Sequence, residues 1–477
     1  MEIISTNPSE NYAVLGKVKA STKNDVKIAV ANARVAFKPW SELKLAERCR
    51  ILSSFVNIAE TRSEEISKLS SLEMGRPIAG TRHNVAGGIK YFNTYIEMAE
   101  KCLKPQVTLE TDKEIDILYH EPWGVIACIC PWNSPFPNVV WQCGQALIAG
   151  NTVVYKNSEE NPLFAKLLSK LIAESEIPKG VFNIVYGDAT IGQYLIREDI
   201  DMISFTGSTK NGQKLARFAA KKFIPIVAEL GGSSPCIVFG DADIDSVVNY
   251  IYDQSFRNSG QNCDSIKRII VHKSKFDELV NKLCKIIATK KVGNALDESA
   301  DIGPLVSKKQ LELLESQVKD AIDKGAHIAC GGTRPEDLSG AYYLPTVLTN
   351  ISTKMRVWKE EVFGPVRPIV PFTTEQQAIG LANDTQYGLS AHIMTNDKEC
   401  FERVSRQIKA GSISQNTTFS SQPFNPFGGY KKSGMGREHG AAGFDEVTQI
   451  KVVSEEKINK VMAGSHIEYR CKNATKR

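Results

Sequence analysis

Hydrophobic residues follow two different periods along this chain of 477 residues, and the changes of period divide it into parts. Up to about residue 105 the apolar positions recur mainly at helical spacing, as in Val26 to Phe37 and Leu45 to Ala59. Between Thr108 and His120 apolar and polar residues alternate, which is typical of a hairpin or an edge strand. The pattern therefore predicts a mainly helical N-terminal part followed by a β-hairpin.

From residue 124 onward, short apolar runs alternate with amphipathic segments. The pattern predicts strands at 124–130, 152–155, 182–186, 202–205 and 224–228, and helices at 138–149, 162–175, 190–197 and 209–220. Such alternation indicates βαβ units, and so a parallel sheet covered by helices. Ligands of these sheets bind at the carboxyl ends of the strands. Four residues that directly follow predicted strands are therefore candidates for binding: Asn133, Lys156, Gly187 and Ser208.

A second α/β stretch follows from 234 to about 415. Its predicted strands are 236–239, 268–272 and 368–371, and its predicted helices are 274–289, 307–324 and 375–382. A Gly-rich segment then runs from Pro426 to Arg437, and a β-like stretch runs from Val447 to Val453. A chain of this length is expected to form two or three domains, and the lack of low-complexity linkers predicts that they pack closely.

The amino-acid composition disfavours several classes of function. With 42% hydrophobic and 24% charged residues, the chain has the usual balance of a globular protein, and its net charge of +5 indicates neither nucleic-acid nor membrane binding. No apolar run reaches the roughly 18–20 residues that a bilayer crossing needs, and the first residues lack the pattern of a signal or transit peptide. Eleven scattered cysteines without a Cys-x-x-Cys pair, and seven dispersed histidines, favour a reducing cytoplasm and no metal site.

Three residues could together oxidise an aldehyde through a thioester. Cys263 follows Asn-Ser-Gly-Gln-Asn and could be a nucleophile, although a cysteine taken alone is more often a small core residue. Glu229 ends a predicted strand before two glycines and could activate water, or could equally lie at a surface turn. Asn133, among prolines, could donate to an oxyanion or simply form a turn. Asp264, next to the cysteine, is expected to raise the pKa of the thiol.

A nucleotide site is also indicated. Gly207 to Gly212 joins a predicted strand to a predicted helix, so backbone N–H groups could face a pyrophosphate. Neither Gly-x-Gly-x-x-Gly nor a Walker sequence is present. Lys156 and Glu159, three residues apart after a strand, could hold a ribose or form an ordinary charged loop.

Together these segments resemble the aldehyde dehydrogenase superfamily, whose members use a nicotinamide cofactor to oxidise aldehydes to carboxylates. The matching segments occur in family order over nearly the whole chain: Pro131-Trp-Asn, Gly150 to Lys156, Phe205-Thr-Gly-Ser208, Glu229-Leu-Gly-Gly, Gly260-Gln-Asn-Cys263, Glu360-Glu-Val-Phe-Gly-Pro365 and Pro426-Phe-Gly-Gly-Tyr-Lys431. The chain looks generally similar to bacterial semialdehyde dehydrogenases that use NAD.

The resemblance implies a role for each matching residue. Cys263 is implied as the nucleophile, Asn133 as an oxyanion donor together with the Cys263 N–H, and Glu229 as the base that hydrolyses the thioester. The implied cofactor-binding residues are Trp132, Lys156, Glu159, Ser208, Leu230, Glu361 and Phe363. A carboxylate at Glu159 can accept from a ribose 2′-OH and repels a 2′-phosphate, so NAD is favoured over NADP.

The resemblance also implies a fold. It is an α/β architecture with a Rossmann-type nucleotide domain (1–107 and 123–231), an α/β catalytic domain (232–430), and a β arm with the C-terminal segment (108–122 and 431–477). The arm is implied to pair 108–122 with 447–453 and to join subunits into a homodimer or homotetramer.

The positions implied to line the aldehyde tunnel are mixed: Ser134, Asn138 and Ser421 are polar, whereas Trp141 and Phe427 are aromatic. Buried polar groups penalise long alkyl chains, which favours a small polar aldehyde such as succinate semialdehyde, lactaldehyde or glycolaldehyde. The succinate branch often has an arginine where this chain has Trp141, and Arg257 and Lys267 are alternatives for that role. Three rival functions are a CoA-acylating dehydrogenase, which Glu229 disfavours, a non-catalytic structural member, which the intact Cys–Glu–Asn set disfavours, and a simple nucleotide-binding module, which would need neither Cys263 nor Glu229.

Overall fold

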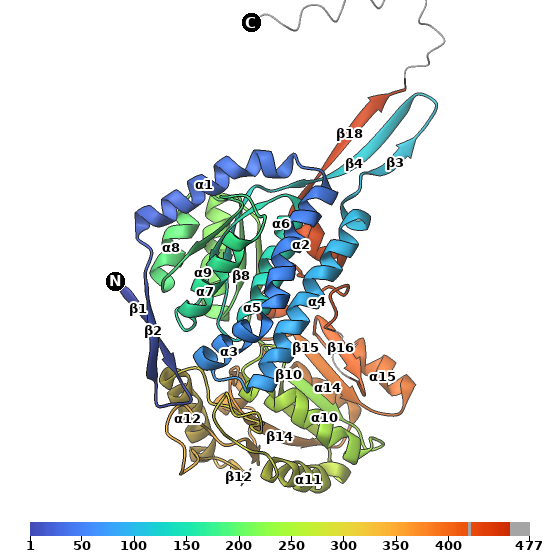
Figure 1. Cartoon of the computed structure of the whole chain (residues 1–477). Helices are drawn as coiled ribbons and strands as arrows, with labels where there is room; N and C mark the ends of the chain where they lie inside the picture. Colours follow the sequence, from blue (N-terminus) through green and yellow to red (C-terminus); the bar gives the residue numbers. More distant parts are fainter. Residues whose placement is uncertain (418–420, 458–477) are drawn as a thin grey trace, which may run out of the picture.

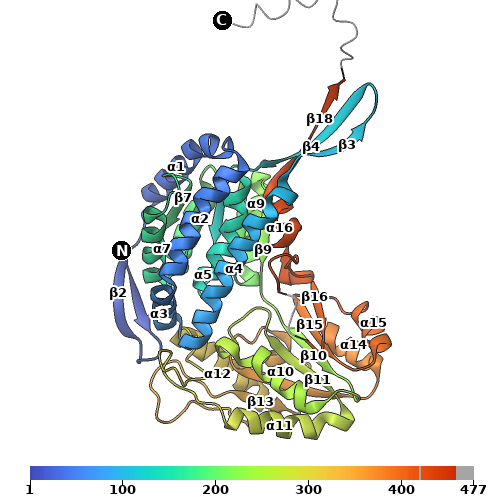
Figure 2. The same ribbon diagram turned by 45° about the vertical axis from the view of Figure 1, so that its right-hand side comes forward.

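Two α/β bodies and a narrow β arm make up the molecule. The computed structural model describes residues 1–417 and 421–457, so the tail beyond Lys457 lies outside the described residues. One body lies above the other, and the arm projects from the upper body (Figures 1 and 2). In the described part of the chain, no helix has both the length and the apolar character that a membrane crossing requires.

The N-terminal part is helical, as predicted, except for its first residues. Residues 2–19 form an antiparallel hairpin that packs on α3 and α7, so the prediction of a mainly helical start is wrong there. The turn of this hairpin holds Asn11 and Tyr12 at positive φ, which a helix does not allow. The elements of this part are β1 (Glu2–Asn7), β2 (Ala13–Lys19), α1 (Lys23–Ser41), α2 (Leu45–Thr61), α3 (Ser63–Met74) and α4 (Ile78–Leu103).

The upper body is built on a six-stranded sheet whose five main strands are parallel, as the βαβ pattern predicts. The chain runs from β5 outward through β6 to β7, then returns to the other side of β5 with β8 and β9. The gap between β5 and β8 is therefore a topological switch point, where open α/β sheets bind their ligands. The strands in spatial order are β17 (Gly434–Met435), β9 (Ile226–Glu229), β8 (Met202–Thr206), β5 (Val125–Ile129), β6 (Thr152–Lys156) and β7 (Phe182–Val185).

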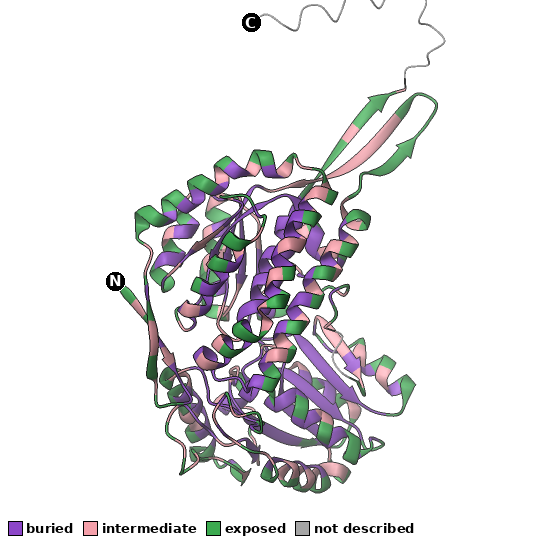
Figure 3. Ribbon diagram, viewed as in Figure 1, coloured by how far each residue is buried: buried purple, intermediate pink, exposed green. Residues whose placement is uncertain are grey.

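Helices cover both faces of this sheet. Along β5, Ile126 and Cys128 pack into the core beneath α2 and α4, whereas Val125, Ala127 and Ile129 pack into the core beneath α1 and α8. Because helices cover both faces, β5 and β6 are buried along their whole length rather than at alternate residues (Figure 3). The remaining helices of the body are α5 (Pro135–Val139), α6 (Gln145–Ala149), α7 (Pro162–Glu174), α8 (Ala189–Arg197) and α9 (Thr209–Lys222).

The helix predicted at 138–149 is not one regular helix. A π-helical turn, Val140–Gly144, separates α5 from α6. Such turns are frequent at functional sites because the extra residue redirects neighbouring side chains. Gly144 lies close against Tyr95 of α4, so a larger residue in this turn would press on that helix. The turn carries Trp141, which the sequence assigns to the aldehyde tunnel.

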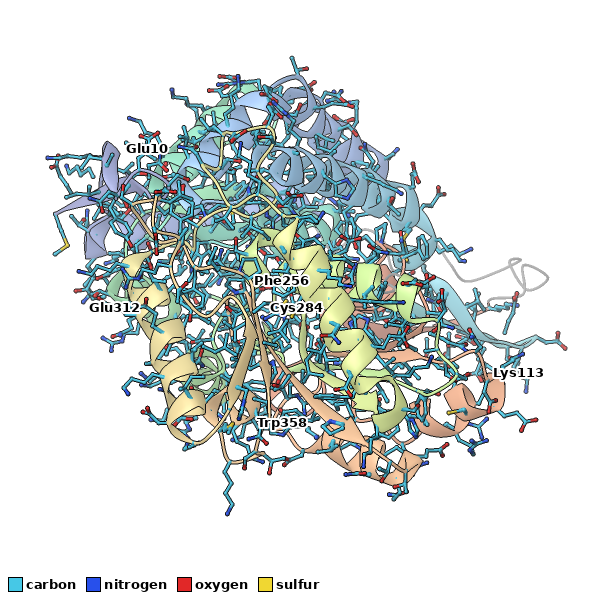
Figure 4. The ribbon with its side chains drawn as sticks, turned by 90° about the horizontal axis from the view of Figure 1, so that it is seen from below. Glu10, Lys113, Phe256, Cys284, Glu312 and Trp358 are labelled. Carbon is cyan, nitrogen blue, oxygen red and sulfur yellow. The ribbon has the colours of Figure 1, made fainter. Side chains whose placement is uncertain are left out.

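The lower body has a seven-stranded sheet, also mostly parallel. Figure 4 shows this body from below and labels Phe256 at the end of α10 and Cys284 on α11. The strands in spatial order are β12 (His327–Cys330), β13 (Thr346–Thr349), β14 (Val366–Phe372), β11 (Ile266–His272), β10 (Ser234–Val238), β15 (Ser390–Met394) and β16 (Ser412–Gln415). Its helices are α10 (Ile244–Phe256), α11 (Phe276–Ala288), α12 (Lys308–Asp323), α13 (Arg356–Lys359), α14 (Glu375–Asn383) and α15 (Lys398–Ser405).

The C-terminal segment contributes to two places. Strand β18 (Thr448–Glu456) pairs antiparallel with β4 (Glu114–Pro122), and β4 pairs with β3 (Gln106–Glu110), so the arm has the predicted pairing of its two segments. Before the arm, β17 adds to β9 at the edge of the upper sheet, and α16 (Gly440–Glu446) packs on α4. The residue boundaries of the domains stay a prediction.

Candidate active site

The predicted catalytic residues lie where the two bodies meet. Asn133 follows β5, and Glu229 is the last residue of β9, whose next residues cross to β10 of the lower body (Figure 2). A Cβ atom on Gly232 in this crossing would overlap the carbonyl oxygen of Cys263. Only glycine allows the crossing strand to run so close to the cysteine. The two glycines after Glu229 thus hold the end of one sheet against the loop of the other.

Cys263 lies in a tightly folded loop between α10 and β11. Asn258, Ser259 and Gly260 all have left-handed φ values, 52°, 54° and 73°, which is a strained conformation for the first two. The Ser259 hydroxyl donates to Gly303 O (2.7 Å), and the Gln261 Oε1 atom accepts from Val306 N (3.0 Å). These bonds hold the loop in its strained form and leave the cysteine half-buried.

The amide of Asn133 reaches this loop. Its Nδ2 atom donates to the carbonyl oxygen of Gln261 at 3.1 Å, across 128 positions of sequence. A side-chain amide has two N–H donors, so one remains for another acceptor. The structure therefore places the amide beside the thiol loop, where a donor to an oxyanion is needed.

The surroundings of Cys263 disfavour its thiolate. Burial raises the pKa of the thiol well above its ordinary value, and the carboxylates of Asp264, Glu361 and Glu229 raise it further. The ammonium group of Lys267 acts in the opposite direction. At neutral pH the resting residue is a protonated thiol, so attack on an aldehyde needs a base that takes its proton.

Glu229 is a candidate for the base that activates the hydrolytic water. The residue is 2% exposed, and neither carboxyl oxygen has a hydrogen-bond partner in the described part of the chain. Its carboxyl group lies beside Gly428. Burial raises its pKa well above the ordinary value, and the nearby carboxylate of Glu438 raises it further, whereas Arg437 lowers it. A carboxyl group without partners is free to turn and to carry protons at neutral pH.

Glu438 was not singled out from the sequence. It is buried, accepts from the side-chain amide of Gln142, and has a pKa raised to about 8 by burial. The one signal that could have revealed it is its place in the Gly-rich segment, between Gly436 and Gly440. We include its carboxyl group in the site because its negative charge raises the pKa of Glu229.

A cavity of about 690 Å³ opens beside Cys263. Of the residues assigned to the aldehyde tunnel, Ser134, Trp141 and Ser421 line it, and Tyr91 donates to or accepts from Ser421 at 2.9 Å. Asn138 does not belong to the described lining, and its amide donates to Pro131 O (3.3 Å). Phe427 packs its ring at 5.7 Å from the His439 ring, which in turn lies 5.9 Å from Trp141.

Charged side chains in this cavity were not predicted as a set. Asp264 pairs with Arg257 at 2.7 Å, and Asp301 pairs with Lys290 at 3.5 Å.

Arg76, only 7% exposed, has no acidic partner among the described residues. One of its Nη atoms donates to Asn133 O and Asn262 Oδ1, both at 3.2 Å, and its Nε atom has no partner in the same part of the chain. Lys267, the other alternative from the sequence, does not line the cavity. Among the charged residues that line the cavity, Arg76 is thus the one without an oppositely charged hydrogen-bond partner in the described part of the chain.

A second cavity, of about 550 Å³, lies at the switch point of the upper sheet. Trp132, Lys156, Glu159 and Ser208 all line it, so the structure brings together four of the residues implied to bind a cofactor. Lys156 is buried and lies 3.3 Å from Glu159. The backbone N–H groups at the start of α9 open into this cavity, and Gly207 comes so close to Phe205 that a Cβ atom would overlap its ring. This cradle fits a dinucleotide phosphate.

The other three implied cofactor residues lie on the way to Cys263. Leu230 packs under the first turn of α9, against Gly212. The Phe363 ring meets the Trp132 ring edge to face at 5.6 Å, and the Glu361 carboxylate accepts from Gly232 N at 3.0 Å. The segment Glu361–Phe363 therefore lies between the phosphate cradle and the thiol, the place where the nicotinamide end of a dinucleotide is needed.

Comparisons with known proteins agree with this geometry. A model of the aldehyde dehydrogenase family matches residues 1–453. The chain is 37% identical to aminoaldehyde dehydrogenase 1, peroxisomal, of Pisum sativum, over 95% of this chain and 92% of that protein. It is 36% identical to the mitochondrial succinate-semialdehyde dehydrogenase of Oryza sativa subsp. japonica, over 93% of this chain and 85% of that protein.

Solved structures have the same fold. An NAD+ complex of an aldehyde dehydrogenase from Bacillus cereus superimposes with a TM-score of 0.92 at 33% identity, covering 96% of this chain and 93% of that chain. An NADP-dependent enzyme of E. coli gives the same TM-score, 0.92, and the same identity, 33%, and covers 96% and 95% of the two chains. This chain therefore belongs to the aldehyde dehydrogenase family, and is an oxidoreductase that acts on aldehydes with NAD or NADP.

Proposed function

We propose that this enzyme oxidises a small polar aldehyde with a negatively charged far end, for which succinate semialdehyde is the best candidate, and that it uses NAD. The observation that supports this substrate is the Arg76 guanidinium in the wall of the cavity next to the Cys263 loop. Asp264 and Asp301 each have a cationic partner, whereas Arg76 has only neutral acceptors among the described residues. A substrate carboxylate in the cavity would give this guanidinium a charged acceptor, and a charge-assisted bond of this kind is worth about 1.5–3 kcal/mol.

In the proposed mechanism each residue has one task. The Cys263 thiol gives its proton to a water molecule and attacks the aldehyde carbon, and the Asn133 amide donates to the oxyanion that forms. A nicotinamide dinucleotide, when bound, supplies the hydride acceptor. Cys263 is then left as a thioester, and Glu229 removes a proton from the water that hydrolyses it to the carboxylate and the free thiol. Glu229 also argues against transfer to CoA, because a hydrolytic base would destroy the thioester first.

The substrate class is tested by an aldehyde panel. With NAD, kcat/KM is expected to be higher for succinate semialdehyde than for lactaldehyde, hexanal or 4-aminobutyraldehyde, by about tenfold or more over the cationic aldehyde. Fastest turnover of hexanal would contradict the polar pocket. Fastest turnover of 4-aminobutyraldehyde would instead assign a cationic substrate, as the name of the pea relative suggests for that protein.

A substitution of Asp264 tests both the substrate preference and the pKa of the Cys263 thiol. Asp264→Asn removes the partner of Arg257 and one of the carboxylates that raise the pKa of Cys263. We expect its preference for succinate semialdehyde over hexanal to increase, and the pH at which iodoacetamide alkylates Cys263 half-maximally to fall. The control is Asp301→Asn, which changes the same cavity next to Lys290 but is absent from the charges that act on the thiol. Equal effects of both variants would refute a specific role of Asp264.

Cofactor preference depends on Glu159. Its carboxylate lies in the cavity 3.3 Å from Lys156 and would repel a 2′-phosphate. Glu159→Gln is expected to improve kcat/KM with NADP by roughly tenfold, because it removes the repulsion and leaves Lys156 to the phosphate. Initial rates with both cofactors measure this. A wild-type enzyme that already prefers NADP would contradict the assignment of NAD.

The arm is proposed to join subunits into a dimer or tetramer. Support comes from the exposed apolar side chains of its outer strands, which pair with no further strand among the described residues: Val107, Leu109, Ile450 and Val452. An edge of this kind is a template for further pairing, and sedimentation would reveal a monomer if the proposal fails. A cytoplasmic location remains a prediction that cell fractionation can test.

A further inference from the structure

Three buried cations lie on strands β11 and β14 of the lower sheet, and each one donates to backbone carbonyl groups. Lys267, Arg268 and Arg367 are at most 1% exposed. Arg268 donates to Ser233 O, Leu381 O and Ala382 O, and Arg367 donates to Ser255 O, Gly364 O and Val366 O. Burying a cation is costly unless its donors are satisfied. Carbonyl-only partners therefore indicate that these cations hold backbone segments in place.

Lys267 differs from the two arginines in what it connects. Its ammonium group donates to Gly260 O at 2.9 Å and to Val362 O at 3.0 Å. Gly260 stands three residues before the candidate nucleophile, and Val362 stands between Glu361 and Phe363. The two acceptors are thus parts of the thiol loop, 7 positions away from the lysine, and of the segment implied to hold the nicotinamide end, 95 positions away.

The same ammonium group also lies over the aromatic ring of Phe363. It lies 4.8 Å from the centroid of the Phe363 ring, and that ring meets Trp132 at 5.6 Å. One positive charge therefore fixes the loop, the segment after Glu361 and the ring beside them. Displacement of a reacting group by about 1 Å costs on the order of 100-fold in rate, so a link at this place matters for catalysis.

We propose that Lys267 is a positioning residue that holds the segment Glu361–Phe363 at a fixed distance from Cys263, and so shapes the binding site for the nicotinamide half of the cofactor. The inference rests on the roles proposed for Cys263 and Glu361. Lys267 acts through backbone carbonyl groups and does not touch the substrate.

Titration of Lys267 supports this role. Burial lowers its pKa to about 7, and the charge of Arg367 lowers it too, whereas Glu361, Cys263 and Asp264 raise it. The protonated form, which makes the stronger charge-assisted bonds, therefore predominates at acidic pH and is lost as the pH rises through about 7. Burial also raises the pKa of Glu361, and its ionisation acts the other way, because a carboxylate is the better acceptor for a ribose hydroxyl.

The test measures NAD binding without turnover. Isothermal titration of the full-length enzyme with NAD gives Kd for wild type, Lys267→Met and Lys267→Arg between pH 6 and 8.5. We expect Lys267→Met to raise Kd about tenfold or more at pH 6.5, and Lys267→Arg to restore most of the affinity. In wild type Kd should rise above pH 7, whereas in Lys267→Arg, whose guanidinium keeps its proton, it should not.

Controls separate this role from a purely structural one. Lys273→Met makes the same change on an exposed lysine just beyond β11 and is expected to leave Kd unchanged. In steady-state assays Lys267→Met should raise KM for NAD more than KM for the aldehyde. A wild-type Kd in Lys267→Met, or an equal rise of both KM values with a fall in melting temperature, overturns the proposal.

If Lys267→Met does not fold, the pH dependence decides. Glu361 titrates in wild type and in Lys267→Arg alike, so the difference between their curves isolates the lysine, and the same pH dependence of Kd in both from pH 6 to 8.5 overturns the proposal. Because binding is measured without aldehyde, these results stand apart from those for the nucleophile: an active Cys263→Ala enzyme would refute the proposed reaction while leaving the binding curves unaltered.

Discussion

Cys263→Ala is expected to lower aldehyde oxidation by at least about 10⁴-fold, because no thioester can form without the thiol. Loss of a covalent nucleophile in a preorganised site typically costs this much or more, and what remains comes from binding and from the oxyanion donors. The variant removes one small side chain from a half-buried position, so little change in stability is expected. Production of NADH from succinate semialdehyde measures the activity.

Two control measurements separate loss of the nucleophile from a general effect of removing a thiol. Cys284→Ala, on α11 of the lower body, removes another half-buried thiol and should retain wild-type activity (Figure 4). NAD titration should show that Cys263→Ala still binds the cofactor, since the cradle at α9 is unaltered. A Cys263→Ala enzyme that oxidises aldehydes at close to the wild-type rate would refute the assignment of the nucleophile.

Glu229→Gln is expected to separate the two halves of the reaction. If Glu229 acts as the hydrolytic base, the variant still forms NADH once per active site and then stalls as the acyl-enzyme, with kcat lowered by about 10²–10⁴-fold. A burst of NADH followed by a slow steady state, together with one added acyl group on Cys263 by mass spectrometry, is the expected result. Steady multiple turnover at the wild-type rate would contradict the role.

The same residue predicts how activity depends on pH. Glu229 must lose its proton to act as a base, and both burial and the charge of Glu438 hold its pKa well above the ordinary value. Hydrolysis is therefore expected to increase with pH toward the alkaline range. Glu438→Gln keeps the shape of its side chain but removes the charge, so the rising limb of the pH–rate profile should shift to lower pH. An unchanged profile in that variant would show that the two carboxyl groups do not interact.

Much of the fold follows from local pattern. The continuous apolar runs at β5 and β6 predicted buried parallel strands, because a strand covered by helices on both faces has no polar side. The alternation within 108–120 likewise predicted the arm. The hairpin at Glu2–Asn7 and Ala13–Lys19 could not be predicted in this way, since it is stabilised by packing on α3 and α7 rather than by its own periodicity.

The π-helical turn at Val140–Gly144 was missed for a related reason. Its residues are buried or nearly so, and they have the apolar spacing of an ordinary helix. What distinguishes them is the close approach of Gly144 to Tyr95 of another helix. Contacts of this kind join positions far apart in sequence, and hydrophobic periodicity contains no information about them.

The sequence by itself determined the alternation of strands and helices in the upper body, the family, and the residues that carry a thiol, a carboxyl group and an amide. These follow from short segments, whose spacing is local. Only the tertiary structure decided what surrounds those groups: that the Asn133 amide meets the loop of Cys263, that the charge of Glu438 raises the pKa of Glu229, that Arg76 lacks an acidic hydrogen-bond partner among the described residues, and that Lys267 joins Gly260 to Val362. The physical reason is that burial and charge act through space. The pKa of a thiol or a carboxyl group depends on neighbours that the fold, and not the order of residues, brings within reach.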